Sequence, residues 1–287
     1  MIGLSGIDWE DAFANGAYIE GAVDYPQRWA EEAARFRAET THRADLAYGE
    51  APRMVMDLLM PQGVSHGLAV FVHGGYWLAF DKSVWSAFAA AALAKGWSVA
   101  LPSYPLAPEA RISAMTQAIG QAITVAASQV EGPIRLAGHS AGGHLVTRMV
   151  CDDTPLADAV VNRIERVVSI SGLHDLRPLR LNSMNERLML SEEEALTESP
   201  ALHAPKGRAE VIAWVGGQER PEFLRQAAFL AEAWRLKGAA TRLVVESGTH
   251  HFNVIDGLKQ ADHPLAHAFC GKRFSPDLEQ NNPQISI

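Results

Sequence analysis

Short, wholly apolar segments alternate with longer segments of helical character along most of the chain. The apolar segments predict strands over residues 53–60, 67–72, 97–101, 134–137, 166–170, 211–215 and 241–245. Helices are predicted over residues 24–40, 83–95, 112–130, 142–151 and 221–237. The apolar segments lack the polar alternation of a strand with one face in solvent. We therefore expect an α/β fold, with a mostly parallel central sheet and helices on both faces.

Two stretches fall outside this alternation. The first 40 residues are expected to form an N-terminal helical arm, because apolar residues recur there at helical spacing. Residues 174–206 show no strand pattern and contain prolines towards both ends. We expect a small helical excursion there, one that can act as a lid over an active site. The acidic run 192–194 within it is expected to lie on a solvated helix face.

The composition is that of an ordinary globular protein. The 287 residues carry 25 basic and 33 acidic side chains, a net charge of −8, and 48% of them are hydrophobic. This length and apolar content suffice for a large core, so residues 1–287 are expected to form a single domain. No basic tract is present, which argues against nucleic acid or an anionic membrane as a partner.

Targeting and cysteine patterns point to the cytoplasm. The first 13 residues carry acidic side chains and no positively charged region, which is unlike a secretory signal. The apolar stretch 84–101 is interrupted by charged and small residues, so it predicts a helix, a turn and a strand rather than a membrane span. Cys151 and Cys270 lie far apart and form no CxxC pair, so no disulfide framework is expected.

One strand-to-helix turn carries the clearest chemical signal. Residues 138–142 read Gly-His-Ser-Ala-Gly between the strand 134–137 and the helix 142–151. This is the G-x-S-x-G nucleophile elbow, whose glycines allow a tight turn that exposes the serine hydroxyl at a helix N-terminus. Open α/β sheets bind ligands at the carboxyl ends of their strands. Ser140 is therefore the candidate nucleophile.

A second turn, residues 73–77, reads His-Gly-Gly-Tyr-Trp directly after the strand 67–72. Adjacent glycines expose backbone N–H groups that can stabilise the negative oxygen formed during acyl transfer. Tyr76 and Trp77 of this turn are candidate substrate-binding residues that can wall an aryl pocket, with packing in the core as the alternative. The predicted oxyanion-hole donors are the backbone N–H groups of Gly74, Gly75 and Ala141.

A serine nucleophile needs a histidine base that is oriented by an acid. Proteins with this elbow place the acid and then the histidine after the serine in the chain. The last predicted strand is followed by His250 and His251, only one of which can face the serine. The acid is expected after the preceding strand, where Glu219 lies, with Asp175 after an earlier strand as the alternative.

Together these motifs resemble the α/β-hydrolase superfamily, and within it the arylformamidase (kynurenine formamidase) branch, which is similar to HGG-bearing esterases. The resemblance spans about residues 45–260 and rests on the motifs HGGYW, GHSAGGHL, PEF and HF. In that family the histidine directly precedes a phenylalanine, which favours His251. The family's acid stands two residues before Pro-Glu-Phe, which favours Glu219, although the animal enzymes usually carry aspartate there.

The resemblance implies hydrolysis of N-formyl-L-kynurenine, a step of tryptophan catabolism, by a Ser-His-acid triad without metal or organic cofactor. Its partner would be a small acyl or formyl substrate, and a homodimer is compatible with this interpretation. One alternative is a carboxylesterase that acts on small or aryl esters, and another is a non-catalytic binding module. A metal-dependent hydrolase is disfavoured, because Phe252 stands where its Gly-Thr-His motif requires an aspartate.

Overall fold

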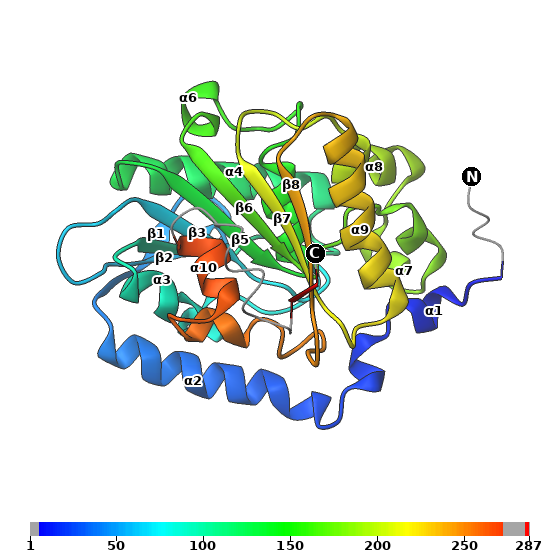
Figure 1. Ribbon diagram of the computed structural model, residues 1–287, viewed down its shortest axis with the longest axis horizontal. Helices are drawn as coiled ribbons and strands as arrows, with labels where there is room; N and C mark the ends of the chain where they lie inside the picture. Colours follow the sequence, from blue (N-terminus) through cyan, green and yellow to red (C-terminus); the bar gives the residue numbers. More distant parts are fainter. Residues whose placement is uncertain (1–5, 272–284, 287) are drawn as a thin grey trace.

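The computed structural model describes residues 6–271 and 285–286 as a central sheet with helices on both faces (Figure 1). The strands are β1 (His42–Ala47), β2 (Val55–Leu59), β3 (Leu68–Val72), β4 (Ser98–Pro102), β5 (Ile134–His139), β6 (Ile164–Ile170), β7 (Glu210–Gly216), β8 (Thr241–Glu246) and β9 (Ile285–Ser286). The α-helices are α1 (Trp9–Ala12), α2 (Tyr25–Glu39), α3 (Ala90–Ala94), α4 (Ile112–Gln129), α5 (Ala141–Arg148), α6 (Asp158–Val161), α7 (Asn185–Leu188), α8 (Glu192–Thr197), α9 (Pro221–Leu236) and α10 (Pro264–Cys270). Short 3₁₀-helices cover Asn15–Tyr18, Ala22–Asp24, Lys82–Val84, Ser86–Ala89, Arg177–Leu181, Pro200–Leu202 and Asp256–Lys259.

The sheet has the strand order β1-β2-β4-β3-β5-β6-β7-β8-β9. All neighbours from β4 to β8 pair in parallel, whereas β1, β2 and β9 pair antiparallel at the two edges. The predicted α/β fold with a mostly parallel sheet is therefore confirmed. The carboxyl ends of the parallel strands lie at one edge of the sheet, which is where the loops that follow β3, β5, β7 and β8 meet.

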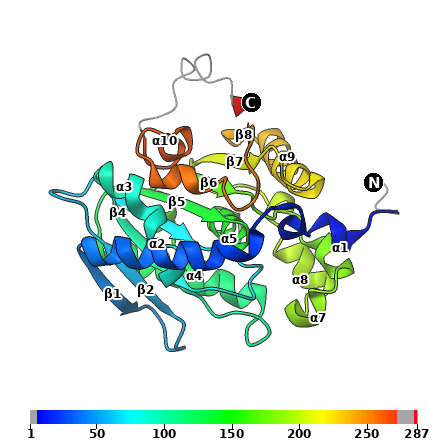
Figure 2. The ribbon, with the colours of Figure 1, turned by 90° about the horizontal axis from the view of Figure 1, so that it is seen from below.

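Each face of the sheet is covered by its own layer of helices. Successive residues of β3 alternate between two apolar clusters, and all five are buried. Residues of α4, α5 and α9 complete one cluster, and residues of α2, α3 and α10 complete the other. Figure 2 shows α2 running across the face that also carries α3 and α10. Burial on both faces explains why the central strands show no polar alternation.

The segment 174–206 folds as the predicted helical excursion, with α7, α8 and two 3₁₀-helices. Its apolar residues Leu179 and Leu188 are fully buried, so the segment is packed against the body. The prediction that the acidic run 192–194 lies on a solvated helix face is wrong for Glu194, which is buried and ion-paired with Arg111. Glu194 also accepts a hydrogen bond of 3.1 Å from the backbone N–H of Ser113, which satisfies a free donor at the start of α4.

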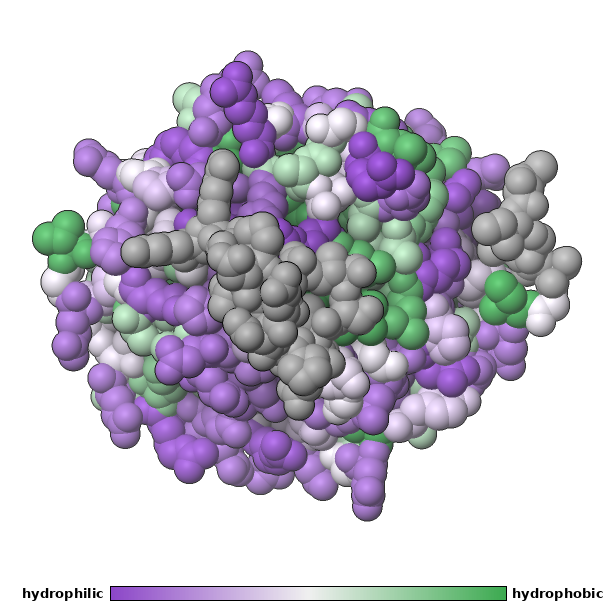
Figure 3. Space-filling model, viewed as in Figure 1, coloured by the Kyte–Doolittle hydropathy of each residue, from purple (hydrophilic) through white to green (hydrophobic). Residues whose placement is uncertain are grey.

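Other elements depart from the sequence predictions. The helix predicted over residues 83–95 is a succession of two 3₁₀-helices and the short α3. Strand β1 was not predicted, because an edge strand that is largely exposed has no apolar run. In the described part of the chain, no helix is both long and apolar enough to cross a membrane. Hydrophilic residues dominate the face drawn in Figure 3, and hydrophobic ones gather over α9.

Candidate active site

The turn between β5 and α5 has the geometry of a nucleophile elbow. Ser140 links the strand to the helix with a positive φ of 54°, a conformation that non-glycine residues rarely adopt. A Cβ on Gly138 would collide with the backbone of Gly142, and a Cβ on Gly142 would collide with the carbonyl of Val72. The two glycines therefore let the turn pack closely against itself and against β3.

Ser140 lines a cavity of about 500 Å³ together with His139 and His251. Its backbone N–H donates to the carbonyl of Ile170 at 2.8 Å, which fixes the turn against β6. Its side chain makes no hydrogen bond to another residue in the part of the chain that the structure describes. Catalytic hydrogen bonds in unliganded sites are often long and tighten only when substrate binds.

His251 follows β8, and its ring is paired with the acid that follows β7. His251 Nδ1 lies 2.6 Å from Glu219 Oε2, and both side chains are buried. The other oxygen of Glu219 accepts from the backbone N–H of Gly216 at 2.9 Å and from the Ser171 hydroxyl. These donors hold the carboxylate in place, so that it accepts the Nδ1 proton of His251 and leaves Nε2 as the free ring nitrogen.

Asp175, the alternative candidate for the triad acid, is ion-paired with other residues. Asp175 forms ion pairs with Arg177 at 2.8 Å and with Arg225 at 3.5 Å. The structure therefore brings Glu219, and not Asp175, to the histidine.

The alternative histidine is also engaged. His250 Nδ1 accepts from the backbone N–H groups of Phe252 and Asn253, while Nε2 lies 3.3 Å from the hydroxyl of Tyr25. Because both ring nitrogens have partners, His250 is suited neither to serve as the base nor to ligate a metal.

The glycine turn after β3 lies against the elbow. A Cβ on Gly74 would sit 3.1 Å from Ser140 Cβ, so the two turns are in close contact. Gly75 has a φ of 112°, which glycine adopts readily and other residues do not. Within the described residues, neither glycine donates a backbone hydrogen bond, and the N–H of Ala141 is an unpaired donor at the start of α5. These three N–H groups are available for a ligand oxygen.

The two aromatic residues of this turn point in different directions. Tyr76 lines the cavity, and its hydroxyl donates to the carbonyl of Phe13 at 2.6 Å. Burial raises the pKa of Tyr76, so its hydroxyl is neutral. The expectation that Trp77 also walls the pocket is wrong, because its ring packs in the core edge-on against His144, 5.2 Å between centroids. Both residues have positive φ, and this tight backbone sends the second side chain inward.

Sequence reasoning missed the contribution of the N-terminal arm to this site. Residues 13–17 and Trp29 line the same cavity as Ser140, and Met184 from the helical excursion adds to the wall. The arm is anchored beside the cavity, because Asn182 donates to the carbonyl of Trp9 at 2.9 Å. The one sequence signal was the apolar content of the arm, and this does not distinguish a pocket wall from core.

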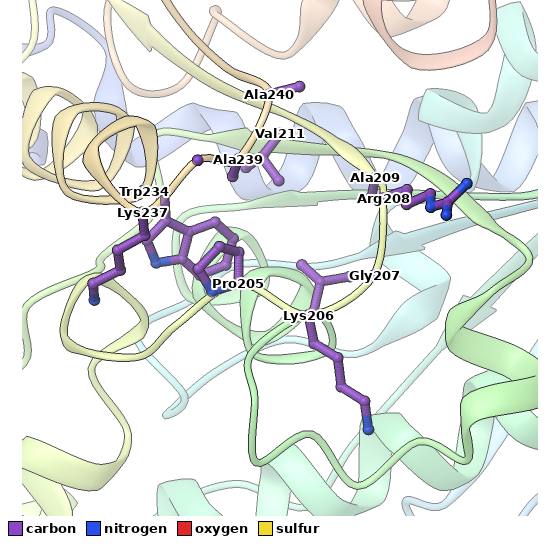
Figure 4. Close-up of a pocket in the computed structure, with 12 residues that line it drawn as sticks. Pro205, Lys206, Gly207, Arg208, Ala209, Val211, Trp234, Lys237, Ala239 and Ala240 are labelled. Atoms are coloured by element: carbon purple, nitrogen blue, oxygen red, sulfur yellow. The ribbon is translucent and has the colours of Figure 1, made fainter.

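A second hollow of about 350 Å³ lies at the amino ends of β7 and β8, away from the elbow (Figure 4). Three cationic residues line it, but Figure 4 shows their side chains directed away from one another. Lys206 pairs with Asp158 at 2.8 Å, and Lys237 donates to the carbonyl of His203 at 2.5 Å. The hollow therefore presents no converging set of chemical groups.

Comparison with known proteins identifies the fold family of the chain. A family model described as alpha/beta hydrolase fold matches residues 69–254, well over half of the chain. The kynurenine formamidase of Danio rerio is 28% identical over 240 residues, which cover 80% of this chain and 82% of that protein.

Solved structures show the same fold. A candidate thioesterase from Silicibacter sp. TM1040 is 52% identical, with a TM-score of 0.88 over 92% of this chain and 99% of its own. An esterase from Pyrobaculum calidifontis has a TM-score of 0.64 at 17% identity, over 85% of this chain and 89% of its own. The chain belongs to the alpha/beta hydrolase fold family.

Proposed function

We propose that this protein is a serine hydrolase that cleaves a formamide or ester bond through Ser140, His251 and Glu219. The observation that carries the proposal is the 2.6 Å contact between His251 Nδ1 and Glu219 Oε2 beside the cavity that Ser140 lines. A carboxylate in this position fixes the tautomer of the imidazole and stabilises its protonated form. Nε2 is then free to accept the serine proton.

In the first half of the reaction, Ser140 Oγ attacks the carbonyl carbon while His251 Nε2 takes the hydroxyl proton. The negative oxygen that develops is bound by the backbone N–H groups of Gly74, Gly75 and Ala141. Removing one such donor from an oxyanion hole typically costs about 3–4 kcal/mol of transition-state stabilisation. The tetrahedral intermediate collapses when His251 gives its proton to the departing amine or alcohol, which leaves an acylated or formylated serine.

In the second half, a water molecule attacks the ester of Ser140, and His251 removes the proton of that water. The same donors bind the second oxyanion, and collapse of the intermediate releases the carboxylic acid and restores the serine hydroxyl. For an aryl formamide the products are formate and an aryl amine. No step in this scheme needs a metal ion or an organic cofactor.

The similar proteins point to different kinds of substrate bond as the one that is cleaved. Hydrolysis of N-formylkynurenine is the candidate that the Danio rerio kynurenine formamidase supports, at 28% identity. Ester cleavage uses the same groups and is the second candidate. The 52% identical candidate thioesterase adds thioesters to the bonds that need testing.

A labelling experiment tests the chemistry, and a substrate panel tests the bond. A fluorophosphonate probe should label the wild-type protein at Ser140 and leave Ser140→Ala unlabelled. The panel compares kcat/KM for N-formylkynurenine, p-nitrophenyl acetate and a short acyl thioester. A kcat/KM that is much higher for the ester would overturn the formamidase assignment. Absence of both labelling and turnover would overturn the hydrolase assignment and favour a binding module.

A further inference from the structure

The cavity beside Ser140 has mainly apolar walls. The N-terminal arm supplies one wall, the turn after β3 supplies a second, and the loop of His251 supplies a third. The large apolar side chains in these walls include Phe13, Trp29, Phe80, Trp85, Met184 and Phe252. A cavity of about 500 Å³ is in the usual range for a small-molecule site.

No lysine, arginine, aspartate or glutamate of the described chain lines this cavity. The neighbouring charged groups are engaged with protein atoms. Arg220 is paired with the carboxylate of Asp11, and its guanidinium lies 3.9 Å above the ring of Tyr18. Glu219 is covered by its contact with His251. A charged group on a ligand inside the cavity would therefore lose water without gaining an opposite charge.

The side-chain amide in the walls does not offer a donor to the cavity. Asn15 is 5% exposed, and its Oδ1 accepts from the backbone N–H of Arg220 at 3.0 Å. Its Nδ2 is buried, with less than 1 Å² exposed, so no ligand atom can reach it without a movement of the wall. Asn15 therefore adds neither a charge nor an accessible donor to the apolar walls.

We infer that the group bound in this cavity is uncharged and largely apolar. This inference rests on the proposed hydrolase function and narrows its substrate class. An aryl or alkyl acyl compound without a charged group fits these walls. A free amino acid, which carries both an ammonium and a carboxylate group, does not, so the inference disfavours N-formylkynurenine among the candidate substrates named above.

Two matched pairs of substrates isolate the effect of a charged group on the substrate. N-formylkynurenine and 2-formamidoacetophenone share the formamide, the ring and the ketone, and only the first carries the charged amino-acid group. O-acetyltyrosine and phenyl acetate form the corresponding pair of esters. We expect kcat/KM to be at least about 10-fold higher for the uncharged member of whichever pair the protein hydrolyses. A charged member hydrolysed as well as its partner, or better, would overturn the inference.

Fluorophosphonate labelling separates failure of this inference from failure of the proposed function. If Ser140 is labelled and the charged substrates are preferred, the hydrolase assignment stands and the inference on the pocket is wrong. If Ser140 is not labelled and none of these substrates is hydrolysed, the proposed function fails, and the inference fails with it.

Discussion

His139 Nε2 lies 2.8 Å from the backbone carbonyl oxygen of His251, so the side chain next to the nucleophile holds the loop that carries the candidate base. The centroids of the His139 and His251 imidazole rings are 4.6 Å apart. A Cβ on Gly74 would lie 3.0 Å from His139 Nδ1, which shows that the ring also contacts the glycine turn. One buried side chain thus joins the serine, the histidine loop and the turn with the free N–H groups.

His139 should therefore act as a positioning residue. Burial and the neighbouring His251 hold the pKa of His139 well below its usual value, so its ring is neutral and Nε2–H donates. His139→Phe keeps an aromatic ring but loses the donor, and we expect kcat to fall about 10- to 100-fold with a smaller change in KM. His139→Gln places an amide N–H at a similar reach and should recover most of kcat.

His144→Gln is the matched control for that experiment. His144 is equally buried, and its Nε2 donates to the carbonyl of Glu198 at 2.7 Å, away from His251. Its kcat should stay close to wild type. If His139→Phe and His139→Gln lose the same activity, the hydrogen bond to His251 is not what matters.

The acid assignment predicts opposite results for two carboxylates. Glu219→Gln should lower kcat by roughly 10²- to 10⁴-fold, because a neutral amide neither fixes the proper tautomer nor stabilises the protonated imidazole. Asp175→Asn should leave kcat nearly unchanged and lower the melting temperature, since Asp175 is paired with Arg177 and Arg225. Steady-state kinetics and thermal unfolding of both variants decide between them. A loss of kcat in Asp175→Asn alone would show the assignment to be wrong.

The adjacent histidines should also behave differently. His251→Ala should abolish detectable turnover at an unchanged melting temperature or a slightly lower one, as Ser140→Ala should. His250→Ala should keep most of the activity, because the contacts of His250 are with Tyr25 and the backbone of its own loop. The rate of fluorophosphonate labelling provides a second readout, and it should fall in His251→Ala but not in His250→Ala.

The nucleophile elbow should not tolerate a methyl group at Gly142. The added Cβ would meet the backbone of Val72 and His73, so β3 or α5 must move. We expect Gly142→Ala to lower the free energy of unfolding by at least about 1–3 kcal/mol. It should also abolish labelling of Ser140. Gly238→Ala is the control, because a Cβ there meets nothing within 4 Å and only its φ of 83° opposes the change. Denaturant unfolding of both variants should rank them in that order.

Stability should fall when the pH drops below about 6.5, the usual pKa of histidine. Burial lowers the pKa of His73 to about 4 and the pKa of His144 and His174 to about 3. Between these values and 6.5, each of these histidines binds more protons in the unfolded chain than in the folded one. The free energy of unfolding therefore decreases with falling pH, by up to about 1.4 kcal/mol per pH unit for each histidine.

His144→Gln tests this dependence. The glutamine can keep the hydrogen bond to Glu198 but does not titrate, so its unfolding free energy should decline less steeply between pH 6.5 and about 4. The difference in slope should reach up to about 1.4 kcal/mol per pH unit within this range. Curves that stay parallel to wild type across this range would contradict the pKa shift of His144.

The sequence predicted the parts of the fold and site that depend on local pattern. The buried central strands were recognisable because both faces are apolar, and the elbow because Gly138 and Gly142 are needed where two backbones touch. The pairing of Glu219 with His251 depends on two loops 32 residues apart. The sequence alone left Asp175 open as an alternative.

Other features depend on contacts that leave no local pattern. Tyr76 and Trp77 are adjacent aromatic residues. Only the backbone conformation of the turn determines that the Tyr76 side chain, and not that of Trp77, reaches the cavity. The pocket wall from residues 13–17 is far from the elbow in sequence, so no motif connects them. His139 occupies a variable position of the G-x-S-x-G motif, so the motif does not predict its hydrogen bond to the backbone carbonyl of His251.

The arm that walls the cavity lies outside the sheet that supports Ser140, Glu219 and His251. Phe13 and Asn15 hydrogen-bond to Tyr76 and to the backbone of Arg220 beside Glu219, so these two residues help to hold the site. Changes at Ala14 and Ala17 can alter which molecules are accepted while the triad stays in place, and mutagenesis confined to these positions offers a route to new selectivity.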